Sequence, residues 1–127
     1  MDKSTNALNW FEIPATDINR AKAFYENVFD IEMDTKEMMG MKMAFFPGES
    51  NSGKASGGIA ESPMHKPSQD GIVIYLNANP AMDNVIEKIE GAGGHVVLPK
   101  TAIGGDMGYM AFFMDTEGNK MGLHSIN

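Results

Sequence analysis

The sequence predicts an α+β fold in which one βαβββ module occurs twice in tandem, over about residues 7–62 and 71–127 of a single domain. The order strand, helix, then three strands is found in each half, with an offset of about 64 residues. The tetrapeptide Met-Ala-Phe-Phe at 43–46 also recurs at 110–113. The agreement of five elements in order carries more weight than the tetrapeptide, and such an internal repeat determines the architecture.

The first half begins with a predicted strand at 10–15, where Phe11 and Ile13 alternate with more polar neighbours. Asp17 is a candidate N-cap for the helix that follows. The helix has an apolar stripe at helical spacing, formed by Ala21, Phe24, Tyr25, Val28 and Phe29. Three strands are then expected at 31–38, 41–47 and 55–61, with a loop rich in Gly, Ser and Asn at 48–54.

The second half follows a linker at 62–70 that contains two prolines. A strand is expected at 72–76, and Pro80 is expected to begin a helix. The apolar face of this helix consists of Met82, Val85, Ile86 and Ile89, and its end is marked by Gly91, Gly93 and Gly94. The remaining strands are expected at 95–99, 107–114 and 120–125, with a turn at 116–119.

Composition narrows the functional classes. The chain has no Cys, which excludes disulfides, thiolate metal sites and thiol nucleophiles and is compatible with a cytoplasmic protein. The formal net charge is −7 with only 10 Lys and Arg residues, so no nucleic-acid partner is expected. The sequence contains neither an apolar signal-peptide segment nor a run of about 18 apolar residues, so no membrane association is expected.

Two motifs carry a resemblance to a known superfamily. The first is Asn9-Trp10-Phe11-Glu12-Ile13-Pro14, followed by Thr16-Asp17, Arg20-Ala21 and Phe24-Tyr25. The second is Asp115-Thr116-Glu117-Gly118-Asn119, followed by Lys120-Met121-Gly122-Leu123-His124-Ser125. Together they resemble the vicinal-oxygen-chelate superfamily of glyoxalases, bleomycin resistance proteins and extradiol dioxygenases, and in particular its small glyoxalase-related proteins.

The resemblance implies that the two modules form curved mixed sheets around a ligand cleft, with the helices outside, and that the protein is a homodimer. In metal-dependent relatives each module supplies one ligand from its first strand and one from its last. The ligand positions correspond to Trp10, Gly58, Ile74 and Gly122. None of these side chains offers a lone pair to a divalent metal, so no metal cofactor is expected.

Strand alternation places Glu12 on the same face as Trp10, and His124 on the same face as Gly122. We therefore expect a ligand-binding cleft lined by Trp10, Glu12, Ile74, Gly122 and His124. Glu12 and His124 are also the candidate catalytic residues, since carboxylate and imidazole groups are common acids and bases. Alternatively, Glu12 and His124 could have a purely structural role, by pairing with each other or by binding backbone groups.

Three readings of function stay open at this point. The first is a metal-free module that binds a small organic ligand. The second is a lyase, isomerase or dioxygenase with a shifted metal site that uses Glu12 and His124, with His65 or a partner subunit as the third donor. The third is an interaction domain without a small ligand. His65 is otherwise expected to be solvated in the linker, His95 to lie at an exposed edge, and Gly104, Gly105 and Gly108 to form a mobile loop over the cleft.

Overall fold

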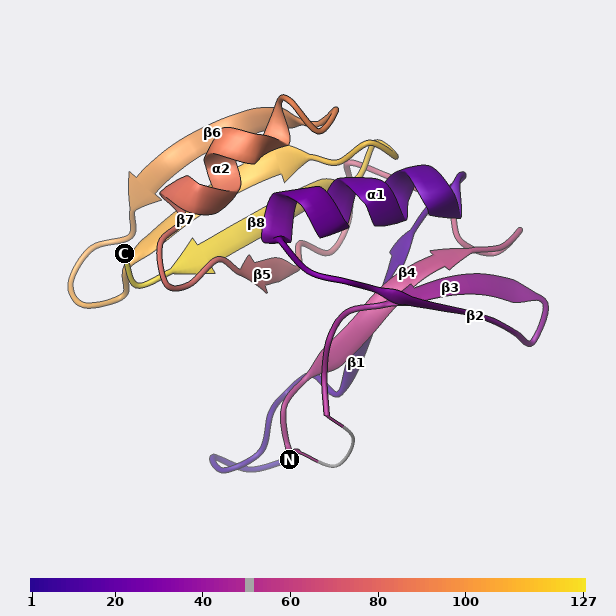
Figure 1. The fold of residues 1–127 in the computed structure, drawn as a ribbon. Helices are drawn as coiled ribbons and strands as arrows, with labels where there is room; N and C mark the ends of the chain where they lie inside the picture. Colours follow the sequence, from indigo (N-terminus) through magenta and orange to yellow (C-terminus); the bar gives the residue numbers. More distant parts are fainter. Residues whose placement is uncertain (50–51) are drawn as a thin grey trace.

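The computed structural model describes residues 1–49 and 52–127 and contains two four-stranded sheets and two helices (Figure 1). The first module consists of β1 (Trp10–Pro14), α1 (Ile18–Phe29), β2 (Asp34–Met38), β3 (Met41–Phe45) and β4 (Ser56–Glu61). The second consists of β5 (Tyr75–Asn77), α2 (Asp83–Ile89), β6 (His95–Ala102), β7 (Tyr109–Met114) and β8 (Lys120–Ser125). The predicted tandem βαβββ order is confirmed, although the predicted loop at 48–54 includes residues 50 and 51, which lie outside the described residues.

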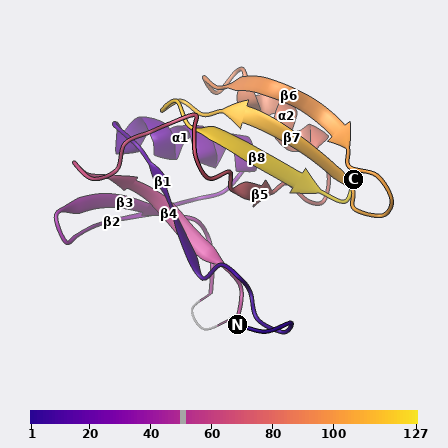
Figure 2. The same cartoon turned by 180° about the vertical axis from the view of Figure 1, so that it is seen from behind.

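The two sheets have the same topology. Their strand orders are β1-β4-β3-β2 and β5-β8-β7-β6 (Figure 2). In each sheet the first and last strands of the module are parallel and the other neighbours are antiparallel. Both sheets are therefore mixed, as predicted, and in each the module's first strand lies at a sheet edge.

Some predicted boundaries differ from the structure in the second module. The helix begins at Asp83 rather than at Pro80, because the chain first forms a tighter turn in which the Asn84 amide donates to the Ala81 carbonyl at 3.2 Å. Strand β6 continues to Ala102, past Pro99. Its pairing with β7 is irregular between Val96 and Thr101, and such an irregularity is where a strand tolerates proline.

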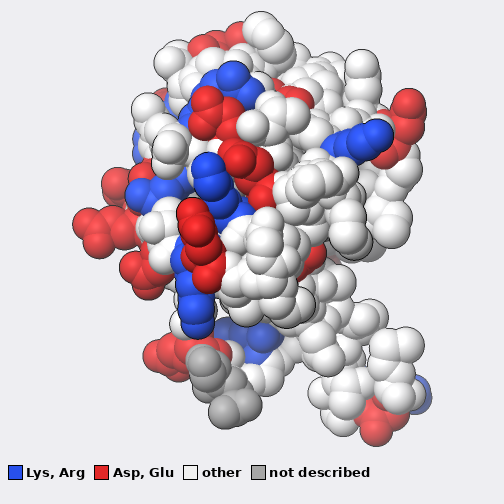
Figure 3. Space-filling view, turned by 90° about the vertical axis from the view of Figure 1, so that its right-hand side faces the viewer, with Lys and Arg blue, Asp and Glu red and all other residues white. Residues whose placement is uncertain are grey.

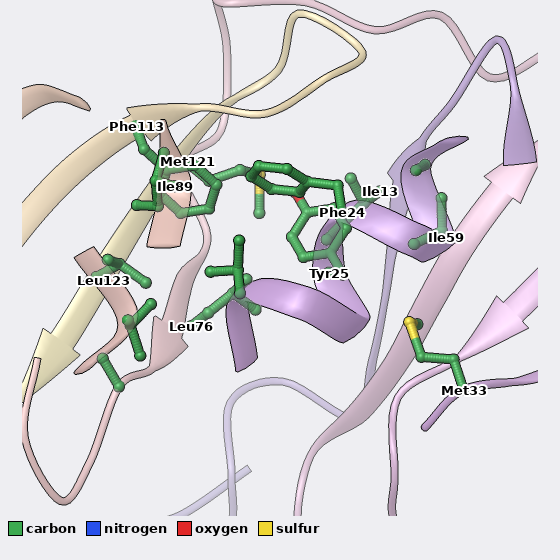
Figure 4. Close-up of a cluster of buried hydrophobic side chains, with 14 of the residues drawn as sticks. Ile13, Phe24, Tyr25, Met33, Ile59, Leu76, Ile89, Phe113, Met121 and Leu123 are labelled. Atoms are coloured by element: carbon green, nitrogen blue, oxygen red, sulfur yellow. The ribbon is translucent and has the colours of Figure 1, made fainter. Parts of the chain in front are cut away.

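Helix α1 joins the two modules into one core. Its N-cap is Asp17, as predicted, whose side chain accepts from the Arg20 amide at 3.1 Å. Its buried stripe contacts both sheets: the ring centroid of Tyr25 lies 5.6 Å from that of Phe46, and the ring centroid of Phe24 lies 6.0 Å from that of Phe113. Figure 4 shows Phe24 and Tyr25 between side chains of the first module and side chains of the second.

A network of hydrogen bonds reinforces this contact between modules. The fully buried Tyr25 hydroxyl donates to Asp115 at 2.8 Å, and the Asn119 amide donates to the carbonyl of Pro14 at 2.7 Å. Glu117 accepts from the amides of Thr16 and Asp17 and from the Arg20 guanidinium. The turn before β8 therefore holds the start of α1 in place. In each sheet, one face packs toward the helices and the other faces outward.

Candidate functional site

In the first module, the outward face combines aromatic side chains with a glycine. Glu12 pairs in register with Gly58 of β4, and Gly58 pairs with Phe45 of β3, so these three residues share one face. Trp10 lies on the same face, with its ring centroid 5.8 Å from that of Phe45. Its side of β1 is opposite to Ile13, which is buried against the core. The predicted alternation of β1 is confirmed.

Glu12 is held by two donors, one on each carboxylate oxygen. The Nε2 atom of His65 lies 2.8 Å from Oε1, and the indole Nε1 of Trp10 donates to Oε2 at 3.2 Å. The hydrogen bond from His65 lowers the pKa of the Glu12 carboxyl and outweighs the opposing effect of partial burial. Because its pKa is lowered, Glu12 is ionised at neutral pH and can accept hydrogen bonds. Its side chain is 31% exposed, so a ligand can reach it.

His65 is placed by a short turn in the linker, and the prediction that it is solvated is wrong. Its side chain is only 15% exposed. Its backbone amide donates to the Ser62 carbonyl at 3.1 Å, and its Nδ1 lies 2.7 Å from the Ser62 hydroxyl oxygen. In the neutral imidazole one nitrogen donates and the other accepts, so Ser62, His65 and Glu12 can form a continuous chain of hydrogen bonds. The spacing of Ser62 and His65, three residues apart, was a sequence signal that could have indicated this turn.

The second module repeats the arrangement with different chemistry. Tyr75 pairs with Gly122, and Gly122 pairs with Phe112, whose ring centroid lies 5.8 Å from that of Tyr75. A Cβ atom at Gly122 would lie 2.6 Å from Cδ1 of Tyr75, so the tyrosine ring covers this glycine. An aromatic pair therefore flanks a glycine on the outward face of each module.

His124 lies in β8, beside Asn77, and is not the partner of Glu12. Its Nε2 lies 2.8 Å from the carbonyl oxygen of Met107, in the loop between β6 and β7, and therefore donates to it. Gly104, Gly105 and Gly108 in this loop all have positive φ angles, as the expected loop requires. The interaction foreseen between Glu12 and His124 is absent from the described residues, because Glu12 is bound to His65 and Trp10 and His124 is bound to the Met107 carbonyl.

The expected site residues are divided between two grooves. Trp10, Glu12 and Ile74 line a groove of about 400 Å³, beside the free edge of β1, whereas His124 lines another of about 380 Å³ with Tyr75, Ile103 and Met110. Gly122 lies beneath the ring of Tyr75. A third groove, of about 570 Å³, lies between the modules and is lined by apolar residues including Phe11, Phe29 and Phe46. Within one chain, the five expected site residues therefore do not line a single cleft. That each of them binds a ligand stays a prediction.

The register of β5 corrects the position assigned to Ile74. Glu12 and Tyr75 are equivalent because each pairs with the glycine of its module's last strand. Extending this register two positions back, to just before β5, makes Val73 rather than Ile74 the counterpart of Trp10. Ile74 instead packs against the core with the buried Leu76. The constant 64-residue period failed because the connections differ in length between the modules: Phe45 and Phe112 are 67 residues apart, but Glu12 and Tyr75 only 63.

The residues present do not fit the metal centre of the metal-dependent relatives. After the correction, the four positions are Trp10, Gly58, Val73 and Gly122, and none provides an oxygen or nitrogen donor from its side chain. The Tyr75 ring lies where a longer side chain at Gly122 would begin. In residues 1–49 and 52–127, moreover, no three His, Asp or Glu side chains lie close enough to hold a metal ion together.

Comparison with known proteins gives consistent results. The family model described as Glyoxalase/Bleomycin resistance protein/Dioxygenase superfamily matches residues 7–123. Proteins named as glyoxylase CFP32, in Mycobacterium tuberculosis and Mycobacterium bovis, are 32% identical over 122 residues. The match covers 94% of this chain and 45% of theirs, so the chain spans about half the length of these relatives.

Solved structures show the same fold at low sequence identity. A glyoxalase/bleomycin resistance protein from Albidiferax ferrireducens has a TM-score of 0.70 at 17% identity, covering 93% of this chain and 97% of that one. A mutant of the fosfomycin resistance protein FosX from Listeria monocytogenes, in complex with Mn(II) and 1S,2S-dihydroxypropylphosphonic acid, has a TM-score of 0.60 at 20% identity, covering 94% and 92%. Glyoxalase I from Zea mays has a TM-score of 0.61 at 14% identity, covering 92% of this chain and 45% of that one.

Proposed function

Because the chain belongs to the glyoxalase, bleomycin resistance protein and dioxygenase superfamily, we propose that it binds a small organic ligand on its outward sheet faces without a divalent metal. The observation that carries this proposal is the composition of the two faces. Where metal-dependent relatives need donors, this chain has Trp10 and Gly58 in one module and Val73 and Gly122 in the other. Aromatic rings beside glycines favour stacking of a ligand rather than coordination of an ion.

A second copy of the chain is part of this proposal. The two grooves that contain Glu12 and His124 are separate in one chain, and a C2 homodimer can bring the first module of one copy to the second module of the other. The free edges differ in character. Edge strand β2 carries Asp34, Lys36 and Glu37, charges that disfavour edge pairing, whereas edge strands β1 and β5 carry a single charge, that of Glu12. Light scattering on purified protein should give twice the chain mass of 13.8 kDa, and a monomer at micromolar concentration would contradict this part.

The proposed partners are small molecules rather than nucleic acids or membranes. Figure 3 shows acidic and basic side chains interspersed on one face of the molecule, without the continuous basic surface that phosphate binding favours. Among the described residues, neither helix has the length and apolar character needed to cross a bilayer. The lack of Cys supports the cytoplasm as the proposed compartment.

A metal-dependent lyase, isomerase or dioxygenase is the second candidate, because Glu12 and His65 provide two donors only 2.8 Å apart. A shifted metal site would need at least one more donor, and His124 of a second copy is the candidate. This reading requires His124 to release the Met107 carbonyl and a metal ion to replace the hydrogen bond between Nε2 of His65 and Glu12, while Ser62 keeps its bond to Nδ1.

Two measurements test the proposal. Elemental analysis of protein purified without chelator should find much less than one Mn, Fe, Ni or Zn per chain, and about one per chain would favour the second candidate. A screen of small aromatic compounds by amide NMR should find binders that shift signals around Trp10, Gly58, Tyr75 and Gly122. A screen without such binders would contradict the proposed ligand-binding function, whatever the metal content.

A further inference from the structure

The outward face of the first module presents a carboxylate beside an accessible indole. Trp10 is 42% exposed, and Phe45 on β3 supports it across β4 at a ring-centroid distance of 5.8 Å. The hydrogen bond from the indole Nε1 to Glu12 fixes the plane of the ring relative to the carboxylate. A ligand that stacks on Trp10 is therefore necessarily close to a negative charge.

The charge of Glu12 is retained rather than neutralised. Its oxygens accept from His65 and Trp10, and each carboxylate oxygen can accept more than one hydrogen bond. In residues 1–49 and 52–127, His65 is the only basic side chain within ion-pair distance of Glu12. The chain of hydrogen bonds from Ser62 through His65 orients the carboxylate without supplying a permanent positive charge.

Resting on the proposed ligand-binding function, we infer that this face selects a flat organic cation, such as an aromatic ring with an alkylammonium substituent or an N-alkylated heteroaromatic ring. The electron-rich face of an indole attracts cations more strongly than any other side-chain ring. The Glu12 carboxylate adds a direct ionic contact or charge-assisted hydrogen bond at the edge of the same ring. The net charge of −7 acts in the same direction at longer range.

Other charged groups line the same groove and define the opposing possibility. Lys66 and Lys120 contribute two positive charges, and Asp70 contributes a second negative charge besides Glu12. The Nζ atom of Lys120 lies over the Phe112 ring, 5.8 Å from its centroid, and is thereby directed toward the second module. With two charges of each sign in the groove, the choice between a cation and an anion depends on which group the ligand touches, and at Trp10 that group is Glu12.

The test compares three probes of nearly equal size and shape at pH 8: the cation N-methylquinolinium, neutral quinoline and the anion quinoline-4-carboxylate. Binding is measured by calorimetry and by the fluorescence of Trp10, which is the only Trp in the chain. We expect the cation to bind about five- to tenfold more tightly than neutral quinoline, the ratio that corresponds to one partly exposed cation–π contact with a neighbouring carboxylate. The anion is expected to bind more weakly than either.

Two variants locate the preference. Glu12→Gln keeps the shape of the side chain and should remove most of the difference in affinity between N-methylquinolinium and quinoline, while the affinity for quinoline changes little. Glu37→Gln removes the same charge from the exposed strand β2 and should leave all three affinities unchanged. Thermal denaturation of both variants reports whether folding is intact, and the comparison of probes on the unmodified protein does not depend on any variant.

The inference is overturned if N-methylquinolinium fails to bind, if it binds no better than quinoline, or if the carboxylate probe binds most tightly through Lys66 or Lys120. It is equally overturned if Glu12→Gln leaves the cation preference intact. These outcomes are distinct from failure of the proposed function: binding of quinoline or its carboxylate would contradict the cation preference while supporting ligand binding. The wider NMR screen tests ligand binding independently.

Discussion

Glu117 offers a quantitative test of how the two modules are held together. Its side chain is fully buried and accepts from the Thr16 and Asp17 amides at 2.9 and 3.0 Å and from the Nε of Arg20 at 2.7 Å. Burial by itself raises the pKa of Glu117, but the bonds from Arg20, the Asp17 amide and other donors outweigh it and lower the pKa from 4.5 to about 2. The ionised form is therefore more stable in the folded chain than in the unfolded chain.

The sign of the pH dependence follows from this lowered pKa. The contribution of Glu117 to folding is fully present above its unfolded pKa of 4.5 and is lost as the pH falls toward the folded value of about 2. A shift of this size corresponds to about 3.4 kcal/mol at pH 7. Because Arg20 is half exposed and the ion pair is screened by solvent, we expect roughly 2 kcal/mol. At pH 3 less than half of it should remain.

Glu117→Gln removes this charge, and its effect can be measured by urea denaturation followed by circular dichroism at pH 7 and pH 3. We expect the variant to lose roughly 2 kcal/mol of unfolding free energy at pH 7 and less than half as much at pH 3. Glu87→Gln, at an exposed site on α2, is the control and should change stability by less than about 0.5 kcal/mol at either pH. An equal loss at both pH values, or a loss at pH 7 no larger than that of the control, would show that the ionised Glu117 does not stabilise the fold.

Two further predictions concern a glycine of the outward face and the shared core. Gly122→Ala should lower the unfolding free energy by about 1–3 kcal/mol in thermal denaturation, because the added Cβ would lie 2.6 Å from Cδ1 of Tyr75. The Tyr75 ring should be displaced, which its NMR signals would show. Gly91→Ala, where there is room for a methyl group, is the control. Unchanged stability and Tyr75 signals in Gly122→Ala would show that the ring does not rest on the glycine. Tyr25→Phe should lose about 1–3 kcal/mol because it leaves the buried Asp115 carboxylate without the 2.8 Å bond from the phenol, and a loss no larger than that of an exposed substitution would contradict a structural role for this bond.

Local sequence patterns were enough to predict the tandem order of elements, the apolar stripe of α1 and the direction in which Trp10 and Glu12 point. These features depend on local periodicity, since a strand alternates its side chains and a helix repeats every 3.6 residues. The residue types at Trp10, Gly58 and Gly122 likewise argue against the family's metal centre, because the lack of a donor atom is a property of the side chain itself and does not depend on how the chain folds.

Which residues come into contact depends on how the two modules pack together. A repeat period predicts equivalent positions only if the connections have equal length, so Ile74 was assigned to the outward face when Val73 and Tyr75 belong there. The contact of His65 with Glu12 joins residues 53 positions apart, and the separation of Glu12 from His124 depends on how α1 packs between modules. Such contacts arise from the packing of whole elements, which no local spacing encodes, because a side chain pairs with whichever group the fold brings within hydrogen-bonding distance.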